Sequence, residues 1–299
     1  MKSFFSFFVF CYITFNLPIF SIDFPKDHSF HPNFKVEWCY FVGNLTARDG
    51  TKISYELSFF KDNLKDKEEI FHAHFALSFP DEKKHLTAQG LERKIGQLAG
   101  YTKNKIWSGD YHLEILSEKK FRIIAKPREK DFSLDLTLSI NNKDDILLQG
   151  KNAYSPKSRK FPVFSYYYSI PRLQTVGTIK VSSKPYEINS GTTWMDHEWS
   201  EEQNSKSSLA SKENSWDWVC LNLEDGSDIM AFNFRNSSKE KSETFGTYRN
   251  KKGEVFYYLN EGEIEFIPGK KIWKSSITKK KYILDWELKT KDFQIHFQD

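Results

Sequence analysis

The residues with the most chemical potential stand together in one short stretch, Trp194-Met195-Asp196-His197-Glu198-Trp199. Two carboxyl groups, an imidazole and two indoles can transfer protons and stabilise a cation. If this stretch is a strand, side chains at i and i+2 share a face, so Asp196 and Glu198 point one way and His197 and Trp199 the other. We therefore expect one of these two pairs to face a cavity.

A second group, Trp216-Asp217-Trp218, places another carboxylate between two indoles. If the two segments lie on neighbouring strands, they form the walls of a pocket. Asp196, Glu198 or Asp217 with a raised pKa would then be an acid that protonates an alkene carbon, and His197 would be a base that activates water. A buried hydrogen-bond network without any reaction explains the same residues equally well.

The elements that position these residues read as strands. Apolar and polar residues alternate over 53–59, 132–140 and 282–288, which places alternate side chains on a core face. Turn signals such as Arg48-Asp49-Gly50 and Glu224-Asp225-Gly226 separate such runs, and no long window has a helical period. The sequence predicts an all-β protein of roughly sixteen strands, which fits two barrels of about eight strands better than one.

The chain start predicts export. Met1-Lys2-Ser3 precedes an apolar run that ends at Phe20, a pattern typical of a secretory signal peptide, here residues 1–21. Cys11 is either lost with this peptide or lipidated. We expect one domain over 22–170 and a second over 171–299, with the boundary near Pro171. The polar stretch Ser200–Ser215 reads as either a lid or a solvated insertion.

Composition narrows the classes of partner. The 44 basic and 40 acidic residues leave a net charge of +4, which gives no broad basic face for nucleic acid. A phosphate-binding loop, a nucleophile elbow and cysteine pairs with metal spacing are missing, so we expect neither a cofactor nor a metal. Cys39 and Cys220 either form a disulfide in an oxidising compartment or remain thiols.

Four segments, in this order, resemble the AttH-like, lipocalin-like secreted proteins, a family that includes the carotenoid 1,2-hydratases. They are His31–Leu45 followed by Phe59-Phe60-Lys61, His72–Leu77, Ser165–Leu173, and Trp194–Ser200 followed by Trp216-Asp217-Trp218 and Leu223–Gly226. Cys39 stands where the family pattern has a second tryptophan. The family's closing motif, G-Y-x-E-L-T-G-Y, is missing before Asp299.

The resemblance implies two tandem lipocalin-like antiparallel β-barrels in an exported protein, periplasmic, outer-membrane-associated or secreted. The second barrel then lacks its closing strands, closes differently, or has a capped edge. Three functions stay open: binding of a lipid- or isoprenoid-like molecule, with membrane proximity or a transport-system partner; a hydratase-like lyase that adds water to a carbon–carbon double bond of a carotenoid-like substrate; and a degenerate structural member. The oligomeric state stays open.

The candidate residues follow from both arguments. The catalytic candidates are Asp196, His197, Glu198 and Asp217. The ligand-binding candidates are Trp38, Tyr40, Tyr167, Arg172, Trp194, Trp199, Trp216 and Trp218. For Arg172 an alternative is that it holds the junction between the two domains.

Overall fold

The structure is a computed structural model that describes residues 21–64, 68–141, 145–160, 163–200, 214–236 and 242–298. Nearly all of the expected signal peptide, Cys11 within it, and positions 201–213 of the expected polar loop lie outside these ranges. A short 3-10 helix, η1 (Lys26–His28), precedes the first strand. No helix in the described ranges has the length and apolar character needed to cross a membrane. The other elements are strands, which confirms the all-β prediction.

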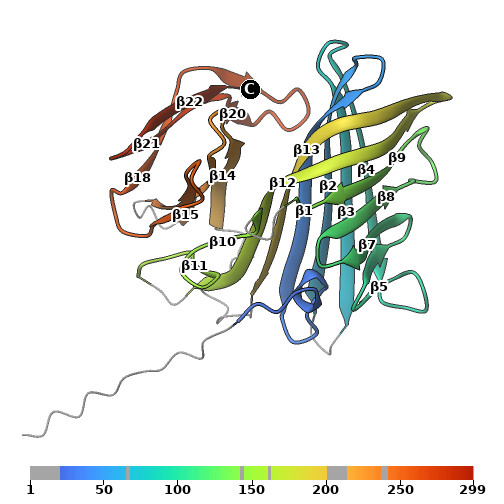
Figure 1. Ribbon diagram of the computed structural model, residues 1–299, viewed down its shortest axis with the longest axis horizontal. Coiled ribbons are helices and arrows are strands. Elements are labelled where there is room, and N and C mark those ends of the chain that lie inside the picture. The colour runs from blue at the N-terminus through green and yellow to red at the C-terminus, as the bar shows by residue number, and fades with distance from the viewer. Residues whose placement is uncertain are drawn as a thin grey trace, which may run out of the picture.

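One large antiparallel sheet forms a nearly closed barrel (Figure 1). Its strand order is β4-β3-β2-β1-β13-β12-β9-β8-β7-β6-β5, with β10 and β11 paired to β12. The sheet curls until β6 meets β3, where the Ser108 hydroxyl donates to the Phe71 carbonyl at 3.3 Å. The strands are β1 (Val36–Ala47), β2 (Lys52–Asn63), β3 (Glu69–Phe79), β4 (Lys84–Arg93), β5 (Ala99–Thr102), β6 (Lys105–Ser108), β7 (Tyr111–Ser117), β8 (Lys120–Ala125), β9 (Phe132–Ser139), β10 (Leu147–Leu148), β11 (Tyr154–Pro156), β12 (Phe164–Val181) and β13 (Lys184–Ser200).

Alternating side chains fill the interior of this barrel. In β2 the residues Ile53, Leu57 and Phe59 are buried, as their alternation predicts, and β9 shows the same pattern. Large rings from several strands meet inside, among them Phe59 and Phe75, both almost fully buried. The described interior is thus a core of buried aromatic and aliphatic side chains.

The expected domain boundary falls inside a strand. Pro171 lies within β12, and both β12 and β13 belong to the large sheet. The pairing of β12 with β13 shifts register between Ile170 and Leu173, because proline has no N–H to donate and is accommodated at a bulge. The change from the large sheet to the C-terminal sheets comes later, between β13 and β14.

The C-terminal strands form three smaller antiparallel sheets, on the side of β12 and β13 away from the barrel (Figure 1). The order is β14-β15-β16-β17 in the first sheet, β18-β21-β22 in the second, and β19-β20 in the third. The alternation over 282–288 predicts one strand, but the chain forms two, with Leu284 between them. The strands are β14 (Asn214–Asn222), β15 (Asp228–Asn236), β16 (Glu243–Arg249), β17 (Val255–Tyr258), β18 (Ile264–Pro268), β19 (Ile272–Lys274), β20 (Lys281–Ile283), β21 (Asp285–Thr290) and β22 (Gln294–Gln298).

Both cysteines of the described ranges are free thiols. Cys39 is buried in β1 and Cys220 is half-buried in β14. Of the two alternatives left open by the sequence, the structure therefore has the unpaired one.

Candidate functional site

The chemical stretch of β13 is divided between two buried environments. His197 and Trp199 face the barrel interior, while Asp196 and Glu198 face the sheet formed by β14 and β15. The prediction that the two pairs face opposite sides is borne out by these contacts. Both pairs are nevertheless buried, with none of the four residues more than 5% exposed, because the C-terminal sheets cover the outer face of β13.

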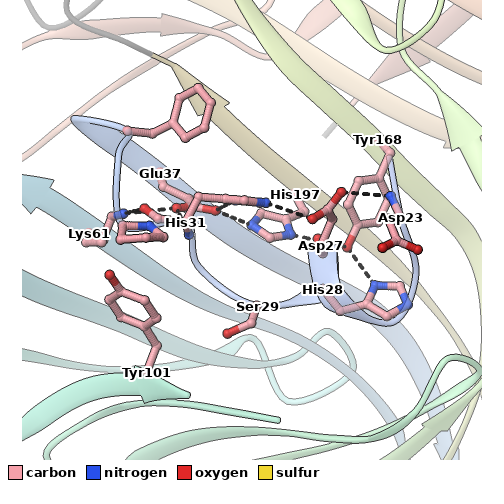
Figure 2. A network of polar contacts seen from close by, with 12 residues as sticks. Asp23, Asp27, His28, Ser29, His31, Glu37, Lys61, Tyr101, Tyr168 and His197 are labelled. Atoms are coloured by element: carbon pink, nitrogen blue, oxygen red, sulfur yellow. Dashed lines mark hydrogen bonds and ion pairs between the residues drawn. The ribbon is translucent and has the colours of Figure 1, made fainter. Parts of the chain in front are cut away.

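On the inner face, Glu37 is the centre of a polar network (Figure 2). Its Oε1 lies 2.9 Å from Nε2 of His197 and 2.6 Å from Nδ1 of His31. Its Oε2 lies 3.1 Å from Nζ of Lys61, which also donates to the His31 carbonyl. The other imidazole nitrogen of His31 lies 3.3 Å from Asp27. Two carboxylates are thus matched by two cationic groups, as burial of charge requires.

The pKa values follow from this balance. Burial acts to raise the pKa of Glu37, but hydrogen bonds from His197 and His31 outweigh it and hold that pKa at about 2. Burial acts to lower the pKa of His31, but hydrogen bonds to Asp27 and Glu37 raise it to about 9. Burial lowers the pKa of His197. At neutral pH His31 is therefore charged and His197 is neutral.

The network joins the segment before β1 to the end of the barrel. His28 of η1 lies 2.8 Å from the Tyr168 hydroxyl, and its Nε2 donates to the Glu118 carbonyl at 3.0 Å. The Tyr168 hydroxyl also lies 3.2 Å from Nδ1 of His197. Burial lowers the pKa of His28 to about 3, so it is a neutral hydrogen-bonding group. These contacts fix η1 across the barrel opening, which is a structural role.

Three residues of the inner network, His31, Glu37 and His197, have side chains of the types that bind metal ions. His31, Glu37 and His197 offer ligand atoms within 4.8 Å of one another. Metal ligands must be deprotonated, however, and His31 holds its proton up to a pKa of about 9. The Lys61 ammonium also occupies the second oxygen of Glu37. A cation at this position would have to replace the His31 proton and lie beside the Lys61 ammonium.

On the outer face, each carboxylate of β13 has its own donors. Glu198 forms an ion pair with Lys157 at 2.7 Å and accepts from the Ser165 hydroxyl at 2.6 Å. Asp196 accepts from the Ser169 hydroxyl at 2.5 Å and from the Trp194 indole at 2.7 Å. Of the two, Glu198 has a cationic partner, whereas the donors to Asp196 are neutral.

The environment of Asp196 favours its protonated form. Burial raises the pKa of Asp196 to about 7, against the opposing effect of hydrogen bonds from Ser169, Trp194 and Tyr167. Tyr167 also accepts a hydrogen bond from the Trp218 indole at 3.3 Å. A chain of contacts thus runs from Asp196 through the Tyr167 hydroxyl to Trp218. A carboxyl group that titrates near neutrality has the property required of a general acid.

A small cavity lies between the large sheet and β14–β15, and we call it the seam cavity. Its volume is about 50 Å³. Trp216 at its edge is 53% exposed, so this wall is open to solvent. The Lys157 ammonium lies 4.3 Å from the ring centroid of Phe232 and 5.1 Å from that of Tyr167. The lining residues are Trp38, Lys157, Tyr167, Glu198, Trp216, Trp218, Phe232 and Phe234.

The seam cavity brings together five of the predicted residues: Trp38, Tyr167, Glu198, Trp216 and Trp218. Three further predicted residues lie close behind. Tyr40 packs edge-on against Trp218 with ring centroids 5.4 Å apart, Trp194 packs in the same apolar cluster as Tyr167, and Asp196 contacts Tyr167.

Four predicted residues lie elsewhere. His197 and Trp199 belong to the inner network, where Trp199 stacks on His31. Asp217 points to the other face of β14 from its tryptophan neighbours, and pairs with Arg235 at 2.5 Å. Arg172 pairs with Asp228 at 2.8 Å and ties β12 to the β14–β15 hairpin.

Three residues that line the seam cavity belong to no sequence motif that predicts a binding site: Lys157, Phe232 and Phe234. Phe232 and Phe234 enter the cavity because β15 pairs with β14 in a register that sets them opposite Trp218 and Trp216. Lys157 comes from the segment after β11, where one lysine among polar residues matches no motif. The strand register and the position of this segment are tertiary facts that a local pattern does not contain.

An all-β barrel with a short 3-10 helix at its opening and a seam against further sheets defines a lipocalin-like protein. The AttH-like family model matches residues 17–298, so the chain belongs to the AttH-like family. This confirms the resemblance. None of the curated proteins matches this sequence.

Two solved structures share the architecture. A crystal structure assigned as AttH from Nitrosomonas europaea has a TM-score of 0.82 and 27% identity, and the match covers 93% of this chain and 84% of that one. The kievitone hydratase of Nectria haematococca has a TM-score of 0.70 and 16% identity, over 93% of this chain and 80% of that one. At that identity the second likeness shows the fold alone.

Proposed function

We propose that the seam cavity binds an apolar, lipid- or isoprenoid-like molecule. The observation that carries this proposal is the concentration of six aromatic side chains around one ion pair, Glu198–Lys157. Binding pockets for small molecules are lined by apolar rings with a few fixed polar groups that orient the ligand. The inner ion pair Glu37–Lys61 also lies near aromatic rings, but both of its side chains are fully buried, whereas the seam cavity is bordered by the exposed Trp216.

The size of the cavity sets a condition on binding. A volume of about 50 Å³ holds one or two waters, each of which takes up about 30 Å³ in the liquid. A larger ligand therefore needs a wall that moves. Trp216 is that wall, since it lines the cavity and is 53% exposed. Rotation of this side chain opens the cavity while Trp38 and Tyr167, on the large sheet, stay fixed.

The proposal is tested with the purified full-length protein. An organic extract analysed by mass spectrometry should contain a stoichiometric apolar molecule, and the fluorescent probe anilinonaphthalene sulfonate should compete with it. Trp216→Ala and Phe234→Ala should weaken probe binding, whereas Trp107→Ala, a matched tryptophan on β6, should not. An empty extract together with equal probe binding by all variants would refute the proposal.

A second function is favoured by one observation, the pKa of about 7 for Asp196. In a hydratase-like reaction, the Asp196–Tyr167 pair would deliver a proton to one alkene carbon. The indole faces of Trp216 and Trp218 would stabilise the cation, and Glu198 would take a proton from the attacking water. The proton taken up by Glu198 would return to Asp196 through solvent before the next turnover, so the net result is addition of one water across the double bond. The likeness in fold to kievitone hydratase supports this candidate, which remains a proposal.

This scheme assigns the base differently from the sequence prediction, because His197 lies on the inner face of β13. Asp196→Asn and Glu198→Gln should each abolish hydration of an acyclic carotenoid, followed as a mass gain of one water. Asp217→Asn is the matched control and should retain activity, since Asp217 pairs with Arg235 outside the seam cavity. Equal turnover by Asp196→Asn and the native protein would exclude the scheme.

We also propose export, on the basis of the basic and apolar N-terminal sequence. Expression of the full chain with a C-terminal tag, cell fractionation and N-terminal sequencing test it. A mature chain that begins near residue 22 outside the cytoplasm supports export. An intact Met1 on cytoplasmic protein contradicts it.

A further inference from the structure

The hairpin β19–β20 and its turn combine a dense positive charge with exposed apolar side chains. Positions 269–284 contain six lysines and neither aspartate nor glutamate. Ile277, at the turn, is 88% exposed, and Trp273 in β19 is 51% exposed. The lysines are Lys270, Lys271, Lys274, Lys279, Lys280 and Lys281, all of them exposed.

The cross-strand pairs of this hairpin are unfavourable for a surface that meets only water. Lys274 lies directly opposite Lys281, and like charges in such a position destabilise a strand pair. On the other face, Trp273 and Tyr282 lie side by side with ring centroids 5.5 Å apart, and both are about half exposed. Isolated exposed apolar residues are ordinary, but a cluster of them beside a block of one charge marks an interaction surface.

The hairpin is attached to the rest of the molecule at its base. The amides of Gly269 and Lys271 donate to the Asp285 carbonyl and carboxylate at 2.9 and 2.7 Å. The Lys270 amide donates to the same carboxylate at 3.1 Å. Asp285, the first acidic residue after the lysines in the sequence, therefore bonds to the backbone where the hairpin joins the rest of the molecule. The turn that contains Ile277 is at the opposite end of the hairpin. Figure 1 places β20 beside the C-terminus.

We propose that the β19–β20 hairpin docks on the surface of an anionic phospholipid bilayer. The lysines pair with lipid phosphates, since clusters of four to eight basic residues beside an apolar element bind anionic lipid surfaces. Trp273 and Tyr282 match the headgroup level, where amphipathic rings are enriched at membrane interfaces. Ile277 enters the boundary of the acyl chains, where its burial is favourable.

The aliphatic turn favours a bilayer over a nucleic acid as the partner. Lysines and aromatic rings would suit either partner. Ile277, however, is the most exposed apolar side chain of the hairpin, and it gains free energy only on entering an apolar phase. A single-stranded nucleic acid offers no such phase. A bilayer can contact the lysines, the aromatic rings and Ile277 together, so it is the partner that fits the hairpin best.

A groove lies between this hairpin and β14. Its volume is about 370 Å³, and Lys281 and Tyr282 line one part while Asp217 and Trp218 of β14 line another. Trp218 also lines the seam cavity. Docking of the hairpin would thus bring the groove close to the bilayer, in whose hydrocarbon interior apolar molecules dissolve. Docking itself does not depend on the proposed ligand, so it is testable without one.

The test is co-sedimentation of the full-length protein with sucrose-loaded vesicles. Vesicles of equal parts phosphatidylcholine and phosphatidylglycerol should bind the protein, and vesicles of phosphatidylcholine alone should bind it weakly. Added salt should release it, because screening weakens the lysine contribution. Lys280→Glu combined with Lys281→Glu should weaken partitioning by at least about 30-fold, since each lysine near such a surface contributes about fivefold.

The controls separate docking from net charge and from misfolding. Lys119→Glu combined with Lys120→Glu, at two exposed positions where the β7–β8 turn meets β8, changes the net charge equally and should leave partitioning nearly unchanged. Ile277→Asp should lower partitioning even at low salt, and its position in the turn leaves the strand pairing intact. No binding of the native protein to the mixed vesicles would overturn the proposal. So would equal losses in both lysine variants, or hairpin-dependent binding of polyuridylate without vesicle binding.

Discussion

Replacement of Lys61 by methionine tests the inner network most sharply. The Lys61 side chain is fully buried, and its ammonium lies 3.1 Å from Glu37. Methionine keeps the length of the side chain but removes the charge, so Glu37 retains only His31 and His197 as donors. Removal of one partner of a buried ion pair costs about 3–5 kcal/mol. The donors that remain, the imidazoles of His31 and His197 and the His31 amide, place this variant at about 3 kcal/mol.

The assay is equilibrium unfolding in urea, which does not screen charge, followed by circular dichroism. The free energy of unfolding extrapolated to water should fall by about 3 kcal/mol. In a thermal melt of the same protein, this loss lowers the melting temperature by roughly 6–12 °C. Lys52→Met is the matched control, because Lys52 is exposed on the same strand, and it should change stability by less than about 0.5 kcal/mol.

A double-mutant cycle then separates charge from packing. Glu37→Gln combined with Lys61→Met removes the carboxylate and the ammonium together, so no charged group of this ion pair is left buried without its partner. The double variant should therefore lose less stability than the sum of the single variants, by about 1–3 kcal/mol. Strict additivity, or a Lys61→Met protein as stable as the native one, would refute the reasoning about this network.

Three further predictions concern pH and the junction between sheets. Because the pKa of His31 rises from 6.5 to about 9 on folding, the stabilisation that protonated His31 contributes is complete below pH 6.5 and is lost as pH rises through 9. The difference in free energy of unfolding between native protein and His31→Gln, measured in urea, should therefore shrink to zero over that range. A constant difference would contradict this reasoning. Because the pKa of Asp196 rises from 3.8 to about 7, its contribution is present below pH 3.8 and is lost as pH rises through 7; Asp196→Asn should gain stability relative to native protein over that range, and parallel melting curves would contradict it. Arg172→Ala breaks the 2.8 Å ion pair with Asp228 and should speed amide exchange in β14 and β15, whereas exposed Arg128→Ala should not; equal exchange in both variants would argue against the junction role.

Local pattern predicted the strands well, because alternation is a property of each segment by itself. The apolar positions that alternate from Ile53 to Phe59 are buried, as the sequence predicts. In β13 the same alternation places Asp196 and Glu198 on one face of the strand and His197 and Trp199 on the other. The same reasoning, applied to β14, sets Asp217 on the face opposite Trp216 and Trp218. The structure places Asp217 beside Arg235 and His197 beside Glu37, because strand pairing and sheet packing decide which faces of the two segments meet.

The partners of these residues were beyond local pattern. Lys157 reaches Glu198 from a position more than forty residues away in sequence, and only the folded chain brings them to 2.7 Å. Pro171 marked a bulge within β12 rather than a linker, since a proline signals an interrupted ladder without indicating whether the strand resumes. Lys61, part of the motif after β1, has its role only through contact with Glu37.

Photoaffinity labelling tests the central claim, that the seam cavity is the ligand site, most directly. A long-chain fatty acid with a diazirine group, crosslinked to the full-length protein and mapped by peptide mass spectrometry, should label β14, β15 and the peptide that contains Lys157 and Tyr167. Prior addition of the co-purified molecule should remove this label. Labelling concentrated instead on the interior strands β3, β7 and β8 would contradict the account.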